Sequence, residues 1–146
     1  MSWIVKSFYD LTNKELHDIL QARVNVFVVE QNCPYSEVDG KDIEALHLFK
    51  KEDETIIAYA RILPPGVSYT QASIGRVLTN KKHRGKRLGY KLIEEALRVI
   101  QKEWKQTSIK IQAQSYLRSF YGSFGFIPVS EEYLEDNIPH IDMLLE

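Results

Sequence analysis

The stretch that decides the fold is IGRVLTNKKHRGKRLGY, which runs from Ile74 to Tyr90. It begins as a short apolar strand, passes through a basic turn with two glycines, and continues into an amphipathic helix. Six of the eleven residues from Lys81 to Lys91 are Lys or Arg. The first N–H groups of a helix have no intrahelical partner, and the helix dipole favours negative charge there. The stretch therefore predicts a site for a polyphosphate, with a solvated basic helix start or a nucleic-acid patch as the alternatives.

The glycine spacing of this turn distinguishes it from two common phosphate-binding motifs. It lacks the Gly-x-x-x-x-Gly-Lys-Ser/Thr order of a P-loop and the Gly-x-Gly-x-x-Gly order of a dinucleotide fold. What remains, Arg84-x-x-x-x-Gly89, resembles the acyl-CoA pyrophosphate loop of the GNAT acyltransferases, whose usual form is Arg/Gln-x-x-Gly-x-Gly/Ala. Arg87 stands where the family has its middle glycine, and a Cβ there narrows the approach of the phosphates. The resemblance implies that the cofactor binds at Arg84, Gly85, Lys86, Arg87, Leu88, Gly89 and Tyr90.

A second motif follows the alternating strand pattern from Ile109 to Gln114. The run FYGSFGF, from Phe120 to Phe126, resembles the GNAT segment in which a Tyr lies four residues before a Gly-Phe pair. The resemblance implies that the Tyr121 hydroxyl points at the CoA sulfur and protonates the leaving thiolate. It also implies that Gln114 reaches the cofactor, where the family often has Asn. Taken alone, Tyr121 is better explained as an aromatic core residue, and it is the phosphate turn upstream that favours the functional interpretation.

The strand that precedes the phosphate turn has a further expected role. In the GNAT family a bulge splays the end of this strand, so its backbone groups pair with the pantetheine and with the acetyl carbonyl. The resemblance places that role on Val77, Leu78 and Thr79.

The N-terminal half narrows the resemblance to one branch of the family. Arg23, the run from Val26 to Asp42, His47 and the segment from Glu135 to Met143 are similar to the ElaA-type branch of the GNAT proteins, with Asn137 where Gly is expected. The resemblance covers nearly the whole chain and implies an N-acetyltransferase whose natural acceptor it does not name.

The composition sets limits on the class of protein. The chain has 146 residues and a net charge of −1, which predicts a single domain over residues 1–146 and no nucleic-acid partner. It has one cysteine, Cys33, and no apolar run of about eighteen residues, so we expect a cytoplasmic protein that does not enter the membrane. No metal site is expected. An exposed strand edge near the C-terminus is compatible with a homodimer.

Periodicity and turn residues predict the order of elements. Thr12 and Glu15 form a capping-box pattern at the start of a helix from about Asn13 to Val28. Pro34 marks a long loop from Glu30 to Glu44, in which 38–44 is expected to supply a short second helical turn. Strands are expected at 3–8, 46–50, 55–63, 73–78 and 109–114, and a long helix at 85–104. The pattern favours a mixed α/β fold of the GNAT type, with a mostly antiparallel sheet flanked by helices.

Acetyl transfer to an amine also needs a base, because a free alkylamine has a pKa of about 10. Glu30 and His140 are the preferred candidates, and Glu37, Asp39 and His47 remain open. Arg23, Glu37, His47 and Arg76 are expected to contact the acceptor. Guanidinium groups of Arg23, Arg61 and Arg76 suit a carboxylate-bearing acceptor, although ion pairs with the loop carboxylates would explain them as well.

The favoured function is transfer of an acetyl group from acetyl-CoA to a primary amine of a small molecule or peptide, directly within a ternary complex. The alternative is a non-catalytic GNAT-fold module that binds CoA for regulation or scaffolding. A nucleic-acid-binding domain is disfavoured, because neither a broad basic face nor a recognisable module is present.

Overall fold

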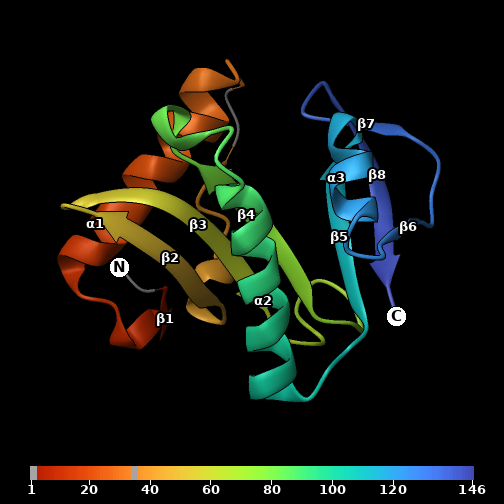
Figure 1. Ribbon diagram of the computed structural model, residues 1–146, viewed down its shortest axis with the longest axis horizontal. Coiled ribbons are helices and arrows are strands. Elements are labelled where there is room, and N and C mark those ends of the chain that lie inside the picture. Colours follow the sequence, from red (N-terminus) through yellow and green to blue (C-terminus); the bar gives the residue numbers. More distant parts are fainter. Residues whose placement is uncertain (1–2, 34–35) are drawn as a thin grey trace.

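The computed structural model describes residues 3–33 and 36–146, so Pro34 and Tyr35 lie outside the described residues. Two four-stranded antiparallel sheets form the molecule, which confirms the mixed α/β prediction (Figure 1). The first sheet has the order β1 (Ile4–Ser7), β2 (Leu46–Glu52), β3 (Thr55–Leu63) and β4 (Ser73–Thr79). The second has the order β5 (Ile109–Gln114), β8 (Ile138–Leu145) and β6 (Ile127–Pro128), with β7 (Tyr133–Glu135) also paired to β8.

Among the described residues, the backbones of the two sheets pair only at the beginnings of β4 and β5. Ala72 and Ile109 form a parallel bridge, and the Lys110 N–H donates to the Ala72 carbonyl at 3.0 Å. Beyond this bridge the two strands diverge, as Figure 1 shows. Backbone groups on the facing edges of β4 and β5 are therefore turned toward a space between the sheets and not toward another strand.

A bulge in β4 contributes to this divergence. The pairing of β3 with β4 shifts register, so Gly75 lies opposite Arg61 and Leu78 lies opposite Tyr59, while Arg76 and Val77 have no Cα partner on β3 in the described register. Arg76 adopts a φ of 49°, a left-handed conformation that is uncommon for a residue other than glycine. The expected splaying of this strand is thus present.

The N-terminal helix starts as the capping box predicts but ends differently. In α1 (Asn13–Arg23), the Glu15 N–H donates to Thr12 Oγ1 and the Thr12 N–H donates to the Glu15 carboxylate. The chain then continues as a π-helix, η2 (Val24–Glu30), in place of a uniform α-helix to Val28. Four-residue hydrophobic spacing does not distinguish these two windings, which is why the sequence alone did not reveal the change.

The long second helix, α2 (Leu88–Trp104), packs on the face of the sheets opposite α1. Its buried residues join a core with both sheets. These are Leu92, Ile93, Ala96, Val99 and Ile100. Its first residue lies three positions after the predicted start, because Gly85 and Arg87 have positive φ values of 87° and 60° that interrupt a helix. No helix among the described residues has both the length and the apolar character to cross a membrane.

The shorter segments complete the frame. The predicted second turn in the long loop is a 3-10 helix, η3 (Lys41–Ile43), and two further 3-10 helices are η1 (Phe8–Asp10) and η4 (Lys81–His83). After β5 the chain forms η5 (Ser115–Leu117) and the short helix α3 (Arg118–Gly122). Asp136 and Asn137 join β7 to β8 with φ values of 52° and 64°, the conformation of a two-residue type I′ hairpin turn. Asn137 adopts there the backbone conformation for which Gly was expected.

Candidate active site

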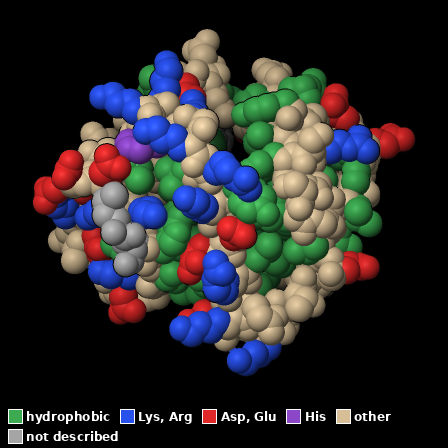
Figure 2. Space-filling model, in the orientation of Figure 1, with side chains coloured by type: hydrophobic (Ala, Val, Ile, Leu, Met, Phe, Trp, Pro, Cys, Tyr) green, Lys and Arg blue, Asp and Glu red, His purple; other side chains and the backbone are tan. Residues whose placement is uncertain are grey.

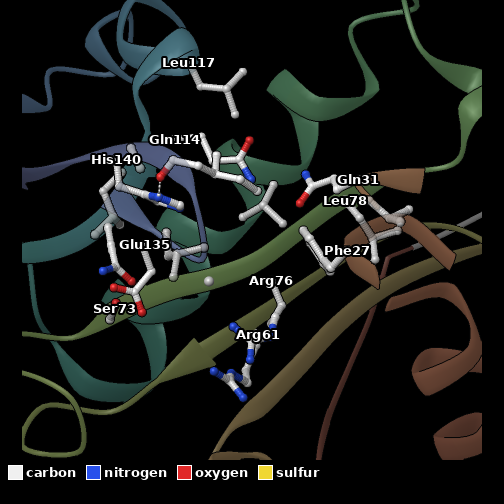
Figure 3. Close-up of a pocket in the computed structure, with 18 of the residues that line it drawn as sticks. Phe27, Gln31, Arg61, Ser73, Arg76, Leu78, Gln114, Leu117, Glu135 and His140 are labelled. Atoms are coloured by element: carbon white, nitrogen blue, oxygen red, sulfur yellow. Dashed lines mark hydrogen bonds between the residues drawn. The ribbon is translucent and has the colours of Figure 1, made fainter. Parts of the chain in front are cut away.

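A cleft of about 990 Å³ lies where the two sheets separate. One wall is formed by β4 and the other by β5 with the β7–β8 hairpin, and the π-helix η2 contributes Val26, Phe27 and Glu30 (Figure 3). In Figure 3, His140, Gln114 and Glu135 lie on one side of the space, and Arg61, Arg76 and Phe27 lie on the other. This volume is in the range of sites that hold small molecules and cofactors.

The turn before α2 provides a second, smaller hollow of about 450 Å³ beside the first. The first intrahelical hydrogen bond runs from the Lys91 N–H to the Arg87 carbonyl, so Leu88, Gly89 and Tyr90 supply the N–H groups of the open first turn. The Arg87 φ of 60° is a conformation that glycine adopts most easily, which explains why glycine is expected at this position. Figure 2 shows Lys and Arg side chains gathered around this turn.

The Arg87 side chain turns onto a neighbouring ring. Its guanidinium lies 4.6 Å from the centroid of Tyr90, and the Tyr90 ring stacks on Phe124 with centroids 4.6 Å apart. An ideal Cβ on Gly89 would contact Phe120 at 3.8 Å and Thr79 at 3.9 Å, so glycine keeps open the space between α2, β4 and α3. The open N–H groups, the exposed basic side chains and this space suit a pyrophosphate.

Arg84 is held by two partners in this turn. Its guanidinium donates to the Glu30 carboxylate at 2.6 Å and to the Thr79 carbonyl at 3.1 Å. Glu30, which was predicted to act as the base, therefore forms an ion pair at the end of the cleft beside the start of α2. Thr79 is one of the residues whose backbone was predicted to bind the cofactor, and its carbonyl accepts from Arg84 in this structure.

Tyr121 lies on α3 and faces the cleft from a largely buried position, with 7% of its surface exposed. Its ring packs edge-to-face against Phe120 and Phe126, with centroids 5.1 and 5.9 Å away. Burial raises the pKa of the Tyr121 phenol above its usual value, so the hydroxyl stays protonated at neutral pH. The core interpretation and the functional interpretation of Tyr121 are both compatible with the structure, because its ring belongs to the core and the residue also lines the cleft.

The remaining predicted cofactor contacts border the same space. Val77, Leu78 and Gln114 all line the cleft. Leu78 remains paired with Tyr59 on β3, whereas Val77 lies in the bulge outside the described ladder. Of the predicted strand residues, Val77 is therefore the one that has no partner in the described β3 register.

His140 occupies the opposite wall, directly across the strand pair from Gln114. Its Nδ1 lies 2.7 Å from the Ile138 carbonyl, the contact drawn as a dashed line in Figure 3. A carbonyl oxygen only accepts hydrogen bonds, so Nδ1 carries the proton and Nε2 of the neutral ring keeps its lone pair. The orientation of the ring thus leaves a proton acceptor at the cleft.

Arg23, Glu37 and His47, which were predicted to contact the acceptor, lie away from the cleft in this structure. Arg23 and His47 are fully buried, Glu37 is 5% exposed, and none of the three lines the cleft. His47 bonds the Tyr59 hydroxyl at 2.7 Å and the Asp42 carbonyl at 2.9 Å. Burial lowers the pKa of His47, so its ring stays neutral. Its hydrogen bonds stabilise the core and do not reach the cleft.

Arg76 does line the cleft, but it belongs to a network of arginines and carboxylates. Its Nε donates at 2.9 Å to Glu37 Oε2, which also accepts from Arg23. Arg23 further donates to Asp42 at 2.8 Å.

The same network includes Arg61, which donates to Asp39 at 2.7 Å and to Asp42 at 3.1 Å. Burial alone would raise the pKa of Asp39, but hydrogen bonds from Arg61 and Lys41 and the nearby guanidinium charges hold it at about 2. The ion-pair alternative for Arg23, Arg61 and Arg76 is therefore the one observed.

Two further residues of the cleft were not singled out from the sequence. Glu135 on β7 and Tyr69 in the loop between β3 and β4 both line the cleft. A hairpin pattern was available as a signal, because polar residues at 133 and 135 and at 140 and 142 flank the turn residues Asp136 and Asn137. Tyr69 carries no comparable signal, since only the folded loop brings it to the site.

The acetyltransferase (GNAT) domain model matches residues 15–146. This chain belongs to the GNAT acetyltransferase family. Protein ElaA of Escherichia coli is 41% identical over 139 residues, which cover 94% of this chain and 91% of that protein. A UPF0039 protein of Synechocystis is 37% identical over 99% of this chain and 94% of its own length.

Solved structures agree with this assignment. An acyl-CoA N-acyltransferase from Pseudomonas aeruginosa is 45% identical and superposes with a TM-score of 0.95 over 99% of each chain. The crystal structure of E. coli ElaA is 40% identical, with a TM-score of 0.93 over the full length of both chains. The GNAT fold and the similarity to ElaA, both predicted from the sequence, are thereby confirmed.

Proposed function

We propose that this GNAT protein transfers an acetyl group from acetyl-CoA to a primary amine of a small molecule or peptide, directly within a ternary complex. One observation carries the proposal: the cleft joins the open N-terminus of α2, the Tyr121 side chain and the His140 imidazole in one continuous space. A cytoplasmic location, in which Cys33 stays reduced, belongs to the same proposal.

The phosphate end and the bulge bind and orient the cosubstrate, which supplies the activated acetyl group. The N–H groups of Leu88, Gly89 and Tyr90 receive the pyrophosphate. The backbone N–H of Val77, which lies in the β4 bulge, donates to the acetyl oxygen as negative charge develops there. Holding both reactants in line replaces a bimolecular encounter with a local one.

Two side chains of the cleft accept and donate protons in the proposed reaction. His140 Nε2 accepts a proton from the acceptor ammonium, because its Nδ1 is already engaged as a donor to Ile138. Tyr121 donates from its phenol to the departing thiolate. The raised pKa of Tyr121 makes it a weak acid, so its contribution is a hydrogen bond that strengthens as charge moves onto the sulfur.

Two measurements test the proposed function. Calorimetric titration with acetyl-CoA reports binding, and thiol release with a panel of primary amines reports turnover. Binding with amine-dependent thiol release supports the transferase. Binding without thiol release for any amine would favour the alternative, a non-catalytic CoA-binding module.

Replacing Gly89 with valine is expected to weaken acetyl-CoA binding by about a hundredfold, the equivalent of one lost charge-assisted hydrogen bond. The glycine has room for one Cβ, but the two γ-methyl groups of valine would project into the space beside Phe120 and Thr79 where the pyrophosphate approaches. Calorimetry measures the effect. Glu94→Val places the same residue on the exposed side of α2 and should leave affinity unchanged; unchanged affinity in folded Gly89→Val would show that the cofactor binds elsewhere.

Replacing His140 with glutamine is expected to lower turnover by about a hundredfold at neutral pH and to leave acetyl-CoA affinity unchanged. Glutamine keeps a polar side chain but does not take up the proton. The deficit should shrink as the pH approaches the amine pKa of about 10, because the acceptor then loses its proton to water.

The control for this variant is His17→Gln, in which an exposed histidine of α1 is changed far from the cleft. A deficit in His140→Gln that stays constant at high pH would contradict the role of base.

A further inference from the structure

Only some of the charged side chains that line the cleft have a partner of opposite charge. Arg61 and Arg76 are paired with Asp39 and Glu37, and Glu30 is paired with Arg84. Glu135 and Asp136, on the β7–β8 hairpin, line the same cleft, and no cation of the described residues lies within ion-pair distance of either. The arginines that line the cleft are thus neutralised by carboxylates, whereas the β7–β8 hairpin keeps its negative charge.

Strand register sets the relation of Glu135 to the base. Glu135 lies opposite Ile138, and Tyr133 lies opposite His140. Residues two apart on a strand share one face, so Glu135 and His140 are diagonal neighbours on the face that borders the cleft. Figure 3 shows their side chains on the same side of the space. Diagonal neighbours on antiparallel strands are about 7–8 Å apart at their backbones, so one short ligand can contact both side chains.

The surroundings of Glu135 also suit a cation. The Tyr69 ring lines the cleft, and burial, followed by the negative charges of Asp142 and Glu135, raises the pKa of its phenol. The Asp142 carboxylate accepts a hydrogen bond from Tyr133. Nearby cations have other contacts: Lys41 donates to Ser68 at 2.8 Å, and the Lys110 ammonium lies 4.8 Å from the Tyr69 ring centroid. The Lys110 ammonium on the Tyr69 ring illustrates the attraction of such surroundings for a cation.

On the basis of the proposed function, we propose that the acceptor is a primary amine whose chain carries a second cationic group, and that Glu135 binds this second group. The reacting nitrogen must lose its charge, and a carboxylate beside it would favour the charged form. Glu135 therefore binds the cationic group that stays charged, while His140 accepts the proton of the nitrogen that reacts. A diamine of about four carbons matches the diagonal spacing of the two side chains.

The test compares two amines of equal chain length, 1,4-diaminobutane and butylamine, as ligands of the CoA-saturated protein. Calorimetry should show at least about tenfold tighter binding of the diamine to the parent protein. Glu135→Gln should remove this preference, Glu135→Asp should retain part of it, and the preference should fall with added salt. Glu132→Gln is the matched control: this exposed glutamate lies just before β7 and outside the cleft, so the preference should persist.

The inference is overturned if the parent protein binds both amines equally, if it shows no detectable binding of the diamine, or if Glu135→Gln keeps the preference. Glu135 is exposed and glutamine has the same shape, so the variant should fold; its circular dichroism spectrum checks this. The readout is binding and needs no turnover. Failure of the proposed function would appear separately, as absent acetyl-CoA binding or absent thiol release with every amine.

Discussion

Tyr121→Phe is expected to lower the turnover number by about a hundredfold, the upper range for loss of one hydrogen bond to a group that becomes charged. The substitution removes only the hydroxyl, so the ring should keep its edge-to-face contacts with Phe120 and Phe126. Acetyl-CoA affinity and the free energy of unfolding should change little. Stopped-flow thiol release, under conditions in which the chemical step limits the rate, measures the effect.

Tyr9→Phe supplies the control for the loss of a phenol, because Tyr9 is 79% exposed and does not line the cleft. Its turnover should equal that of the parent. If Tyr121→Phe also matches the parent when chemistry limits the rate, the hydroxyl has no part in the reaction and Tyr121 is a core residue only. A proportional loss of acetyl-CoA affinity would indicate a role in binding instead.

Arg23→Met is expected to lower the free energy of unfolding by about 3 kcal/mol, the lower end of the cost of removing one partner from a buried ion pair. Arg23 is fully buried and bonds both Glu37 and Asp42. Methionine fills much of the volume but leaves these carboxylates with one cation fewer in a low-dielectric region. Arg76 and Arg61 still contact them, which keeps the loss from being larger. Urea unfolding followed by fluorescence or circular dichroism gives the value.

Arg98→Met is the matched comparison, since Arg98 is 65% exposed at its side chain and pairs with Glu95 within one turn of α2. Exposed pairs of this kind contribute at most about 1 kcal/mol, so that variant should stay close to the parent. Equal stability of Arg23→Met and the parent would mean that the network adds no net stability. Methionine would then compensate by packing, as buried ion pairs sometimes allow.

Local sequence patterns were sufficient to predict much of the fold. The Thr12 and Glu15 capping box forms as expected, and β5 has the predicted bounds of Ile109 and Gln114. These features depend on neighbours in the chain: a cap is satisfied within one helical turn, and a strand with one buried face alternates every second residue. The resemblance carried by Arg84, Gly89 and Tyr121 was sufficient for the family.

Side-chain roles in the acceptor region were harder to predict, because they depend on partners distant in sequence. Arg23 and His47 have residue types that suit binding or catalysis, but both are fully buried, Arg23 against loop carboxylates and His47 against Tyr59 and a loop carbonyl. Glu30 has a type that suits a base, but it pairs with Arg84, 54 positions further along the chain. Contacts over such separations leave no periodic signal.

The sequence by itself determined the order of elements, the basic turn before the long helix and the family, since each rests on short-range spacing or on a motif that stays contiguous in the chain. Only the tertiary structure decided which charges remain available at the cleft. Three arginines are neutralised by carboxylates of one loop, whereas Glu135 is brought beside His140 by the β7–β8 register. Net charge at a site depends on which groups meet in space, and a list of residues in order does not contain that information.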